Sequence, residues 1–222
     1  MKISIVIPTL NERAVIAETV TNALTLGPAE VIVIDGNSED GTAEVAARAG
    51  AKVAVTRTGC ACQLNAGAAA AVGEALLFLH ADTTLPPNAI KRVEEILSEP
   101  TVSLGAFRLG FDRDDRGTRF LTFGADLRIR LFQLPYGDQA LFLRKEIFDR
   151  LGGFREIPIM EDLCMVRRAK RLGRIVVAPD SVRTSPRRYD RTGLLRNMLR
   201  NWTGAALFLL GVAPEKLVRF RG

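Results

Sequence analysis

Short apolar runs alternate with helix-like patterns along the first half of the chain. Runs bounded by turn residues predict buried strands, and they cover residues 3–7, 31–34, 52–55 and 75–79. Between these runs, the spacing of the apolar positions predicts helices over residues 13–26, 42–49 and 63–72. This alternation predicts an α/β protein with a Rossmann-like, mostly parallel central sheet, because the connecting helices then cover both faces.

The pattern loosens in the second half, where helices outnumber strands. It predicts strands over residues 102–111, 139–143 and 174–178. It also predicts helices over residues 88–98, 116–132, 145–151, 161–172 and 192–210. The sequence shows no internal repeat and no low-complexity linker, so we predict a single domain over residues 1–222.

Charge is distributed unevenly between the two halves. Residues 1–111 carry 8 Lys/Arg and 12 Asp/Glu, a net of −4, whereas residues 112–222 carry 23 and 13, a net of +10. A basic half of this kind suits an anionic ligand, an anionic membrane surface or nucleic acid. Only two Tyr and one Trp are available to stack on bases, and no nucleic-acid-binding motif occurs, so we expect no nucleic-acid partner.

The cysteines and the apolar runs indicate the compartment. Cys60, Cys62 and Cys164 are too few and too unevenly spaced for a disulfide framework, which indicates a reducing environment. The first apolar run is too short for a signal peptide. No stretch reaches the roughly 18–20 apolar residues that span a bilayer. We therefore expect a cytoplasmic protein.

Ligands of parallel sheets bind at the carboxyl ends of the strands, so the residues just after each run carry the functional signal. Residues 8–12 follow the first run without the Gly-x-Gly-x-x-Gly pattern, which argues against a dinucleotide-dependent dehydrogenase. Asp35 ends the second run and offers a hydrogen-bond acceptor for a nucleobase or a ribose. Asp40 and Thr42 follow it, and a role as caps of the next helix explains both.

His80 and Asp82 follow the fourth run, two residues apart. Continued extension of the strand would put both side chains on the same side. A carboxylate is a hard ligand that suits Mg²⁺ or Mn²⁺, and imidazole accepts Mn²⁺ more readily than Mg²⁺. We predict a divalent metal site here, with a hydrogen-bonded structural histidine as the alternative for His80.

Taken in order, these segments resemble a family 2 glycosyltransferase with the GT-A fold. The matching segments are residues 5–12, 33–42, 78–82, 152–154 and 160–162. The resemblance implies an enzyme that moves a sugar from a nucleotide-diphosphate sugar to an acceptor. It also implies that residues 1–111 bind the nucleotide and that residues 112–222 hold the acceptor and end in a helical segment.

The resemblance assigns roles to individual residues. Asp82, with His80 beside it, would bind Mg²⁺ or Mn²⁺ on the donor diphosphate. Arg57 would contact the base or the phosphates, and Ala81 would lie in the same nucleotide pocket. The base and ribose would lie against Pro8, Thr9, Asn11, Glu12 and Asp35.

The chain departs from the family pattern at the metal motif. His80 replaces the first Asp of the usual Asp-x-Asp, and it is the only histidine in the chain. The late histidine that often supplies another ligand is therefore absent, and Ser181 or Arg183 would stabilise the diphosphate instead. The His-Ala-Asp variant resembles that of a small bacterial subgroup linked to arsenosugar biosynthesis.

Family 2 members generally invert the anomeric carbon in one displacement, which requires a single base. The resemblance gives this role to Asp162, with Glu161 beside it at a predicted helix N-terminus that favours an ionised carboxylate. A purely structural preference of both residues for a helix N-terminus is the alternative. Asp138 and Gln139 are candidate acceptor contacts or, equally, parts of an ordinary turn. We expect Asp35, Asp82 and Asp162 to converge on one cleft.

The C-terminal segment adds a second interpretation of the acceptor. Several arginines precede Trp202 and the apolar residues 205–213. A run of this length suits a core or interfacial helix, and basic residues beside a Trp favour an anionic membrane surface. A lipid-linked acceptor, with peripheral contact at the inner face of the membrane, is thus the alternative to a small-molecule acceptor. A non-catalytic nucleotide-sugar-binding protein is a third interpretation.

Overall fold

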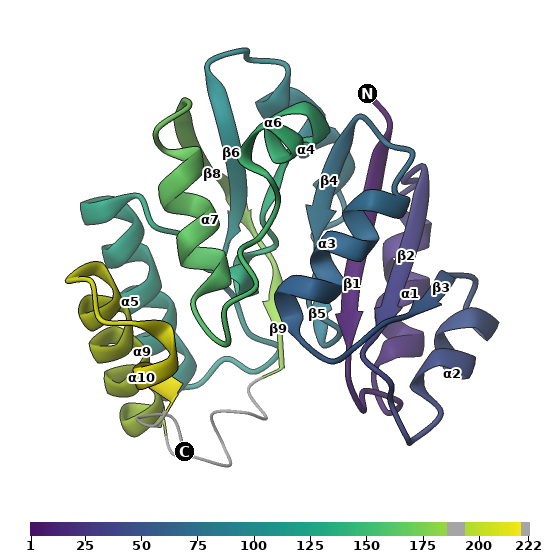
Figure 1. Ribbon diagram of the computed structural model, residues 1–222, viewed down its shortest axis with the longest axis horizontal. Helices are drawn as coiled ribbons and strands as arrows, with labels where there is room; N and C mark the ends of the chain where they lie inside the picture. Colours follow the sequence, from purple (N-terminus) through teal and green to yellow (C-terminus); the bar gives the residue numbers. More distant parts are fainter. Residues whose placement is uncertain (186–193, 219–222) are drawn as a thin grey trace.

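The computed structural model of the protein describes residues 1–185 and 194–218. Its centre is one seven-stranded sheet that runs through both halves of the sequence (Figure 1). Six of the strands run parallel to at least one neighbour, which confirms the predicted α/β fold with a mostly parallel sheet. In spatial order the strands are β3 (Lys52–Val55), β2 (Glu30–Asp35), β1 (Ile3–Thr9), β4 (Ala75–Phe78), β7 (Phe142–Arg144), β6 (Val102–Arg108) and β8 (Arg174–Ser181).

Helices cover both faces of the sheet. The buried residues of one face include those of α3 (Cys60–Ala70), α6 (Lys145–Leu151) and α7 (Glu161–Ala169). The buried residues of the other face include those of α1 (Ile16–Thr25), α2 (Thr42–Arg48) and α4 (Ala89–Leu97). The remaining helices gather beyond the β6 and β8 side of the sheet in Figure 1: α5 (Arg116–Phe132), α9 (Leu194–Leu209) and α10 (Pro214–Val218).

Strands β1, β2 and β4 are buried on both faces, as the apolar runs predict, whereas β3, at the edge of the sheet, is largely exposed and that prediction of a buried strand was wrong. All six residues of β2 are buried, as parallel strands between two helical layers require. The alanine-rich helix α3 packs closely on this part of the sheet, because a Cβ on Gly67 would lie only 2.2 Å from Val6 Cγ1. The small residues of α3 therefore serve helix-to-sheet packing.

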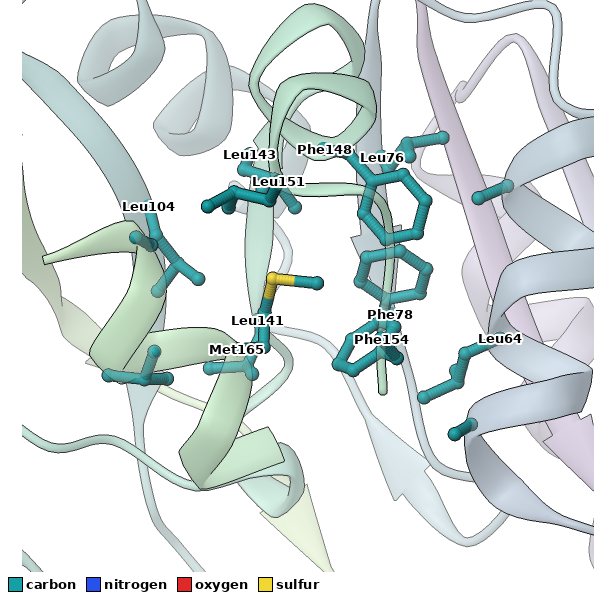
Figure 2. Close-up of a cluster of buried hydrophobic side chains, with 14 of the residues drawn as sticks. Leu64, Leu76, Phe78, Leu104, Leu141, Leu143, Phe148, Leu151, Phe154 and Met165 are labelled. Atoms are coloured by element: carbon teal, nitrogen blue, oxygen red, sulfur yellow. The ribbon is translucent and has the colours of Figure 1, made fainter. Parts of the chain in front are cut away.

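An aromatic cluster joins α6 to the sheet. The ring of Phe78 in β4 lies 5.5 Å from that of Phe148 and 4.9 Å from that of Phe154, measured between centroids. Figure 2 shows these rings together, with Leu64 of α3 on one side and Met165 of α7 on the other. The cluster fixes the segment that leads from α6 to α7, and hence the start of α7.

The predicted bounds agree best where a helix has clear ends. The predictions for residues 116–132 and 145–151 coincide with α5 and α6. The strand predicted over 139–143 lies instead at Phe142–Arg144, because Gly137–Gln139 form a 3-10 turn, η1, and Ala140 has a left-handed φ of 47°. Residues 192–193 of the last predicted helix lie outside the described residues.

Three features of the fold carry no signal in the apolar pattern. Strand β7 runs antiparallel to both β4 and β6. Strands β5 (Thr83–Thr84) and β9 (Arg183–Thr184) form a separate two-residue ribbon. Helix α10 has only five residues.

Among the described helices, none combines the length and the apolar character that crossing a membrane requires.

A buried carboxylate ties three segments together at the amino ends of the strands. Glu30 Oε1 accepts hydrogen bonds from Ser4 Oγ at 2.6 Å and from the Val72 N–H at 2.7 Å, and Lys52 Nζ lies 2.7 Å from Oε2. Burial alone would raise the pKa of Glu30, but the hydrogen bonds from Lys52, Ser4 and Val72 outweigh it and hold the pKa below its ordinary value of 4.5. The ionised form is therefore the one that stabilises the fold.

We expect Glu30→Gln to lower the free energy of unfolding by about 1–3 kcal/mol at neutral pH. Since the folded-state pKa of Glu30 is lowered, its contribution is present above the unfolded-state value and is lost as the pH falls through the folded-state pKa. The difference between the two proteins should therefore shrink in acid. Urea denaturation at neutral and acidic pH measures it. Glu146→Gln, which removes an exposed ion pair with Arg144, is the matched control and should have little effect; an equal effect of both variants would contradict the assignment.

Candidate functional site

The carboxyl ends of β1 and β2 form one hydrogen-bonded unit around Asp35. This carboxylate is almost completely buried. Its Oδ1 accepts from Thr9 Oγ1 at 2.9 Å and from Ser38 Oγ at 2.6 Å, and its Oδ2 accepts from the Ser38 N–H at 2.7 Å. Asp35 thus shapes this edge of the sheet, and Thr9 is held beside it.

The two loops that follow β1 and β2 are joined to each other. The Asn11 N–H donates to Ser38 Oγ at 2.8 Å, and the Glu39 N–H donates to Asn11 Oδ1 at 3.1 Å. Asn11 adopts a left-handed φ of 56° to make these bonds, a conformation that Asn tolerates better than most residues. The Glu12 N–H donates to Thr42 Oγ1 at 2.9 Å. The predicted nucleotide residues Pro8, Thr9, Asn11, Glu12 and Asp35 therefore share one small region.

Gln63 of α3 supports this edge of the sheet, and the sequence analysis did not single it out. Its side-chain amide is buried and donates to Thr9 O at 2.7 Å and to Ile34 O at 2.8 Å. One amide group therefore satisfies the last carbonyls of two neighbouring strands. A Gln inside an alanine-rich helix gave no sign of this role, because the contact depends on the distance between α3 and the sheet.

Arg57 lies on an exposed loop after β3. Its guanidinium is 68% exposed and forms an ion pair with Glu156 of the segment before α7. The hydrogen bond that Arg57 donates to Glu156, followed by the charge of Glu156, raises the pKa of Arg57. The pair connects the first half of the chain to the second half at the surface. Contact of Arg57 with a nucleotide stays a prediction.

A cavity of about 420 Å³ opens where the sheet edge meets α7 and α9. It brings together the predicted residues His80, Asp138, Glu161 and Asp162. Further lining comes from residues that the sequence did not single out, including Cys60, Tyr136, Arg200 and Asn201. Asp35 and Asp82 do not line this cavity. Of the three carboxylates that were expected to converge on one cleft, only Asp162 lines it.

Asp162 is held in place by two backbone donors. The Gly137 N–H donates to its Oδ2 at 2.7 Å, and the Leu163 N–H donates to its Oδ1 at 2.7 Å. A Cβ on Gly137 would lie 3.4 Å from Asp162 Oδ2 and 3.3 Å from His80 Nε2. The carboxylate and the imidazole therefore border the same small space, and a side chain at position 137 would make tight contacts with both.

Glu161 precedes Asp162 at the start of α7 and lies in a different environment. Burial raises the pKa of Glu161, and the neighbouring Asp162 carboxylate raises it further. Cys60 and His80 both lie close enough to oppose this rise. The charged form of Glu161 is thus disfavoured, which distinguishes the two adjacent carboxyl groups chemically.

The residues of the expected metal motif lie in a turn. Strand β4 ends at Phe78, and the Thr83 N–H donates to His80 O at 3.2 Å. His80 and Asp82 are therefore not on an extended strand, and the alternation that predicted both side chains on one side does not apply. His80 lines the cavity with Asp162, whereas Asp82 does not.

Asp82 lies instead towards the segment after β6. The Ser185 N–H donates to Asp82 O at 3.2 Å. The pKa of nearby Asp112 is raised, first by burial and then by the charge of Glu18. The charge of Arg183 opposes this rise, and the charge of Asp82 adds to it. Within residues 1–185 and 194–218, no group of three or more His, Cys, Asp or Glu side chains is arranged to hold a metal ion. A cation here would take most of its ligands from the donor and from water, as Mg²⁺ often does.

Two of the predicted contacts are replaced by structural roles. Gln139 is 0% exposed; its amide donates to Phe107 O at 2.9 Å and accepts from Arg128 at 2.8 Å. This leaves no part of Gln139 for an acceptor, and we correct that expectation: Gln139 holds η1 in place. Ala81 is also buried, and its carbonyl accepts from Thr19 Oγ1 at 2.6 Å, so its side chain packs in the core.

The sheet order, with antiparallel β7 inserted between parallel strands and a cavity at the carboxyl edge, is that of the GT-A fold. Residues 4–157 match the family model described as "Glycosyl transferase family 2". The chain belongs to this family, as its motifs predicted.

Known relatives carry names that agree with the family. A "PGL/p-HBAD biosynthesis glycosyltransferase" of Mycobacterium bovis is 32% identical over 162 residues, which cover 68% of this chain and 62% of the relative. "Glycosyltransferase AglJ" of Haloferax volcanii is 30% identical over 162 residues, which cover 69% of this chain and 49% of the relative. The chain therefore spans less than two thirds of the length of these relatives.

Solved structures agree with the fold. A mannosyltransferase of Pyrobaculum calidifontis, solved with GDP-Man and Mn²⁺, superposes with a TM-score of 0.70 at 21% identity, covering 92% of this chain and 60% of the other. Glucosyl-3-phosphoglycerate synthase of Mycobacterium tuberculosis, solved with Mn²⁺, UDP and phosphoglyceric acid, gives 0.68 at 22% identity, covering 95% and 79%.

We expect Gln63→Leu to lower the free energy of unfolding by about 1–3 kcal/mol, because two buried carbonyls each lose one hydrogen bond. It should also weaken binding of a nucleoside diphosphate, since Thr9 and Asp35 would no longer be fixed. Urea denaturation and titration calorimetry measure the two effects. Gln139→Leu is the matched control: it removes a buried amide from η1 and should lower stability similarly while leaving nucleotide affinity nearly unchanged. Equal nucleotide affinity of Gln63→Leu and the unmodified protein would contradict this role.

Proposed function

We propose that the chain is an inverting glycosyltransferase that moves a sugar from a nucleotide-diphosphate sugar to a small-molecule acceptor, assisted by a divalent metal. Membership of family 2 supports the reaction class. The observation that carries the proposal is the position of Asp162, which faces a cavity beside the nucleotide edge and is held there by Gly137 and Leu163.

The nucleotide would lie on the unit formed by β1, β2 and Gln63. The buried Asp35 network keeps Thr9 and the backbone of Asn11 in fixed positions, so a base and a ribose meet a preformed surface. The sugar would then extend past His80 into the cavity, where it approaches Asp162.

A single carboxylate is sufficient for the proposed chemistry. The acceptor hydroxyl oxygen forms a bond to the anomeric carbon while the bond to the diphosphate oxygen breaks, and the hydroxyl proton passes to Asp162. Two backbone donors hold the Asp162 carboxylate in position, so its orientation is fixed before the acceptor binds.

The divalent metal is part of the proposal because two structural neighbours were solved with Mn²⁺ or Mg²⁺ and UDP. Asp82 would be its carboxylate ligand, with His80 as a second candidate in the same turn. When bound, the cation would offset the charge that develops on the leaving diphosphate. Arg183 of β9, whose charge acts on the nearby Asp112, would add positive charge to the same side.

The acceptor would enter between η1 and α9. Asp138 offers a carboxylate there, and Arg200 and Asn201 line the opposite side. Tyr136 stacks against Arg128, whose guanidinium carbon lies 3.4 Å from the ring centroid, and this contact fixes one wall. These polar groups favour a hydroxylated or anionic acceptor.

We expect Asp162→Asn to retain donor binding and to reduce sugar transfer by about 10²–10⁴-fold, because the proton acceptor is lost. Glu161→Gln is the matched neighbour and should have a smaller effect on turnover. Single-turnover transfer measures the chemistry, and calorimetry with the donor measures binding. If Glu161→Gln lost transfer and Asp162→Asn retained it, the base would be Glu161. If the unmodified protein bound the donor but transferred no sugar, it would be a non-catalytic nucleotide-sugar-binding protein.

We expect Asp82→Ala to fold but to lose transfer by about 10²-fold or more, because the diphosphate loses its counter-charge. Mn²⁺ should tighten binding of the nucleoside diphosphate to the unmodified protein, and this increase should disappear in Asp82→Ala. Calorimetry with and without Mn²⁺ gives a reading that is independent of turnover. Asp149→Ala, at an exposed position of α6, is the control. A normal increase with Mn²⁺ in Asp82→Ala would remove the metal assignment.

A further inference from the structure

Exposed apolar side chains are concentrated on one part of the surface. Nine of the fifteen large apolar side chains that are exposed among the described residues belong to α5, α9 and α10, and a tenth, Leu210, directly follows α9. The two longer helices are in contact, because Leu121 and Ala125 of α5 and Trp202 of α9 line the same small cavity. A concentration of this kind marks an interaction surface rather than ordinary surface composition.

Helix α5 is apolar on two opposite sides. Its buried residues, which include Leu121 and Ala125, face the protein. At the helical period the exposed apolar residues fall on the other side, and they are Phe120, Phe123, Leu127 and Leu131. Phe123 and Leu131 are 64% and 62% exposed, so this outer stripe has no covering element among the described residues.

Basic residues lie beside the outer stripe of α5 and are also frequent in the C-terminal segment, residues 186–222. Arg116 and Arg130 of α5 are exposed and lie beside the stripe at the helical period, as does Arg119, which forms an ion pair with Asp114. In the sequence, residues 186–222 carry 8 Lys/Arg and 2 Asp/Glu, a net of +6, which equals the formal net charge of the whole chain. The basic excess of the protein is therefore carried by the segment that includes α9 and α10.

This charge distribution decides between two partners for the outer stripe, a second copy of the chain and an anionic lipid surface. In a two-fold dimer the same patch meets itself, so the arginines of one copy would face those of the other and repel them. An anionic lipid surface instead accepts both features, because apolar side chains enter the boundary of the acyl chains while arginines remain among the anionic headgroups. Trp202, 41% exposed on α9, has the ring type that favours this boundary.

We propose that the outer stripe of α5, together with the exposed apolar side of α9, docks the protein on an anionic lipid surface. The surface adjoins the candidate active site, because Arg200 and Asn201 of α9 line the cavity while Leu199 and Trp202 of the same helix are exposed. Docking through these helices would bring the acceptor end of the cavity close to the headgroups. The docking itself does not depend on sugar transfer.

Flotation of the full chain with vesicles tests the proposal without donor or acceptor. The protein should float with vesicles that contain phosphatidylglycerol and remain behind with vesicles of phosphatidylcholine alone, and added salt should weaken the binding. The double variant Phe123→Gln/Leu131→Gln should bind about tenfold more weakly or worse, because two apolar anchors are lost. Arg130→Glu should also weaken binding to the anionic vesicles.

Matched controls come from the opposite end of the sheet. Val55→Gln/Val72→Gln removes two side chains of similar exposure, 60% and 67%, and Arg48→Glu reverses an exposed charge on α2; both should float like the unmodified protein. Failure of the unmodified protein to float, or equal losses in the control variants, would overturn the proposal. So would a stable dimer in light scattering that the α5 double variant converts to monomer, because the stripe would then be a self-interface.

Discussion

The site depends on the parallel pairing of β1 with β2 on one side and β4 on the other. This register sets Thr9 opposite Asp35 and Val6 opposite Phe78. Because β1 and β2 are buried on both faces, a slip of one residue would move every side chain to the opposite face and disturb both helical layers. Core packing therefore fixes the edge of the sheet around Asp35, and Gln63 of α3 then secures the ends of β1 and β2 with one amide group.

The opposite wall of the site is built from strained turns. Ala140, just after η1, and Met160, just before α7, adopt left-handed φ angles of 47° and 66°. Such conformations cost free energy in residues other than glycine and persist only where the surroundings enforce them. Here they lie on either side of the hydrogen bond from Gly137 to Asp162. The strain is thus located where the orientation of the candidate base is decided.

The sequence predicts the parts of this structure that depend on local pattern. The sheet class and the bounds of α5 and α6 follow from apolar spacing and from end signals, and the positions of Asp35 and Asp162 follow from motifs at element ends. Features that depend on distant contacts could not be predicted. The antiparallel direction of β7 needs its neighbours, the turn at His80 needs the Thr83 hydrogen bond, and the burial of Gln139 needs Arg128 and Phe107. From the sequence alone, a polar residue in a turn looks like a ligand contact both when its side chain faces a cavity and when it faces the core.

Helix α9 shows how the inside and the outside of the site are connected. Successive residues of a helix are separated by about 100° around its axis, so one turn can present Arg200 to the cavity and Trp202 to the surface. The same helix approaches Met160 closely, since a Cβ on Gly204 would lie 3.1 Å from Met160 Cε. Met160 is the residue before Glu161 and Asp162. Helix α9 therefore connects the apolar surface with the residue that precedes the two carboxyl groups, and its position contributes to the shape of the cavity.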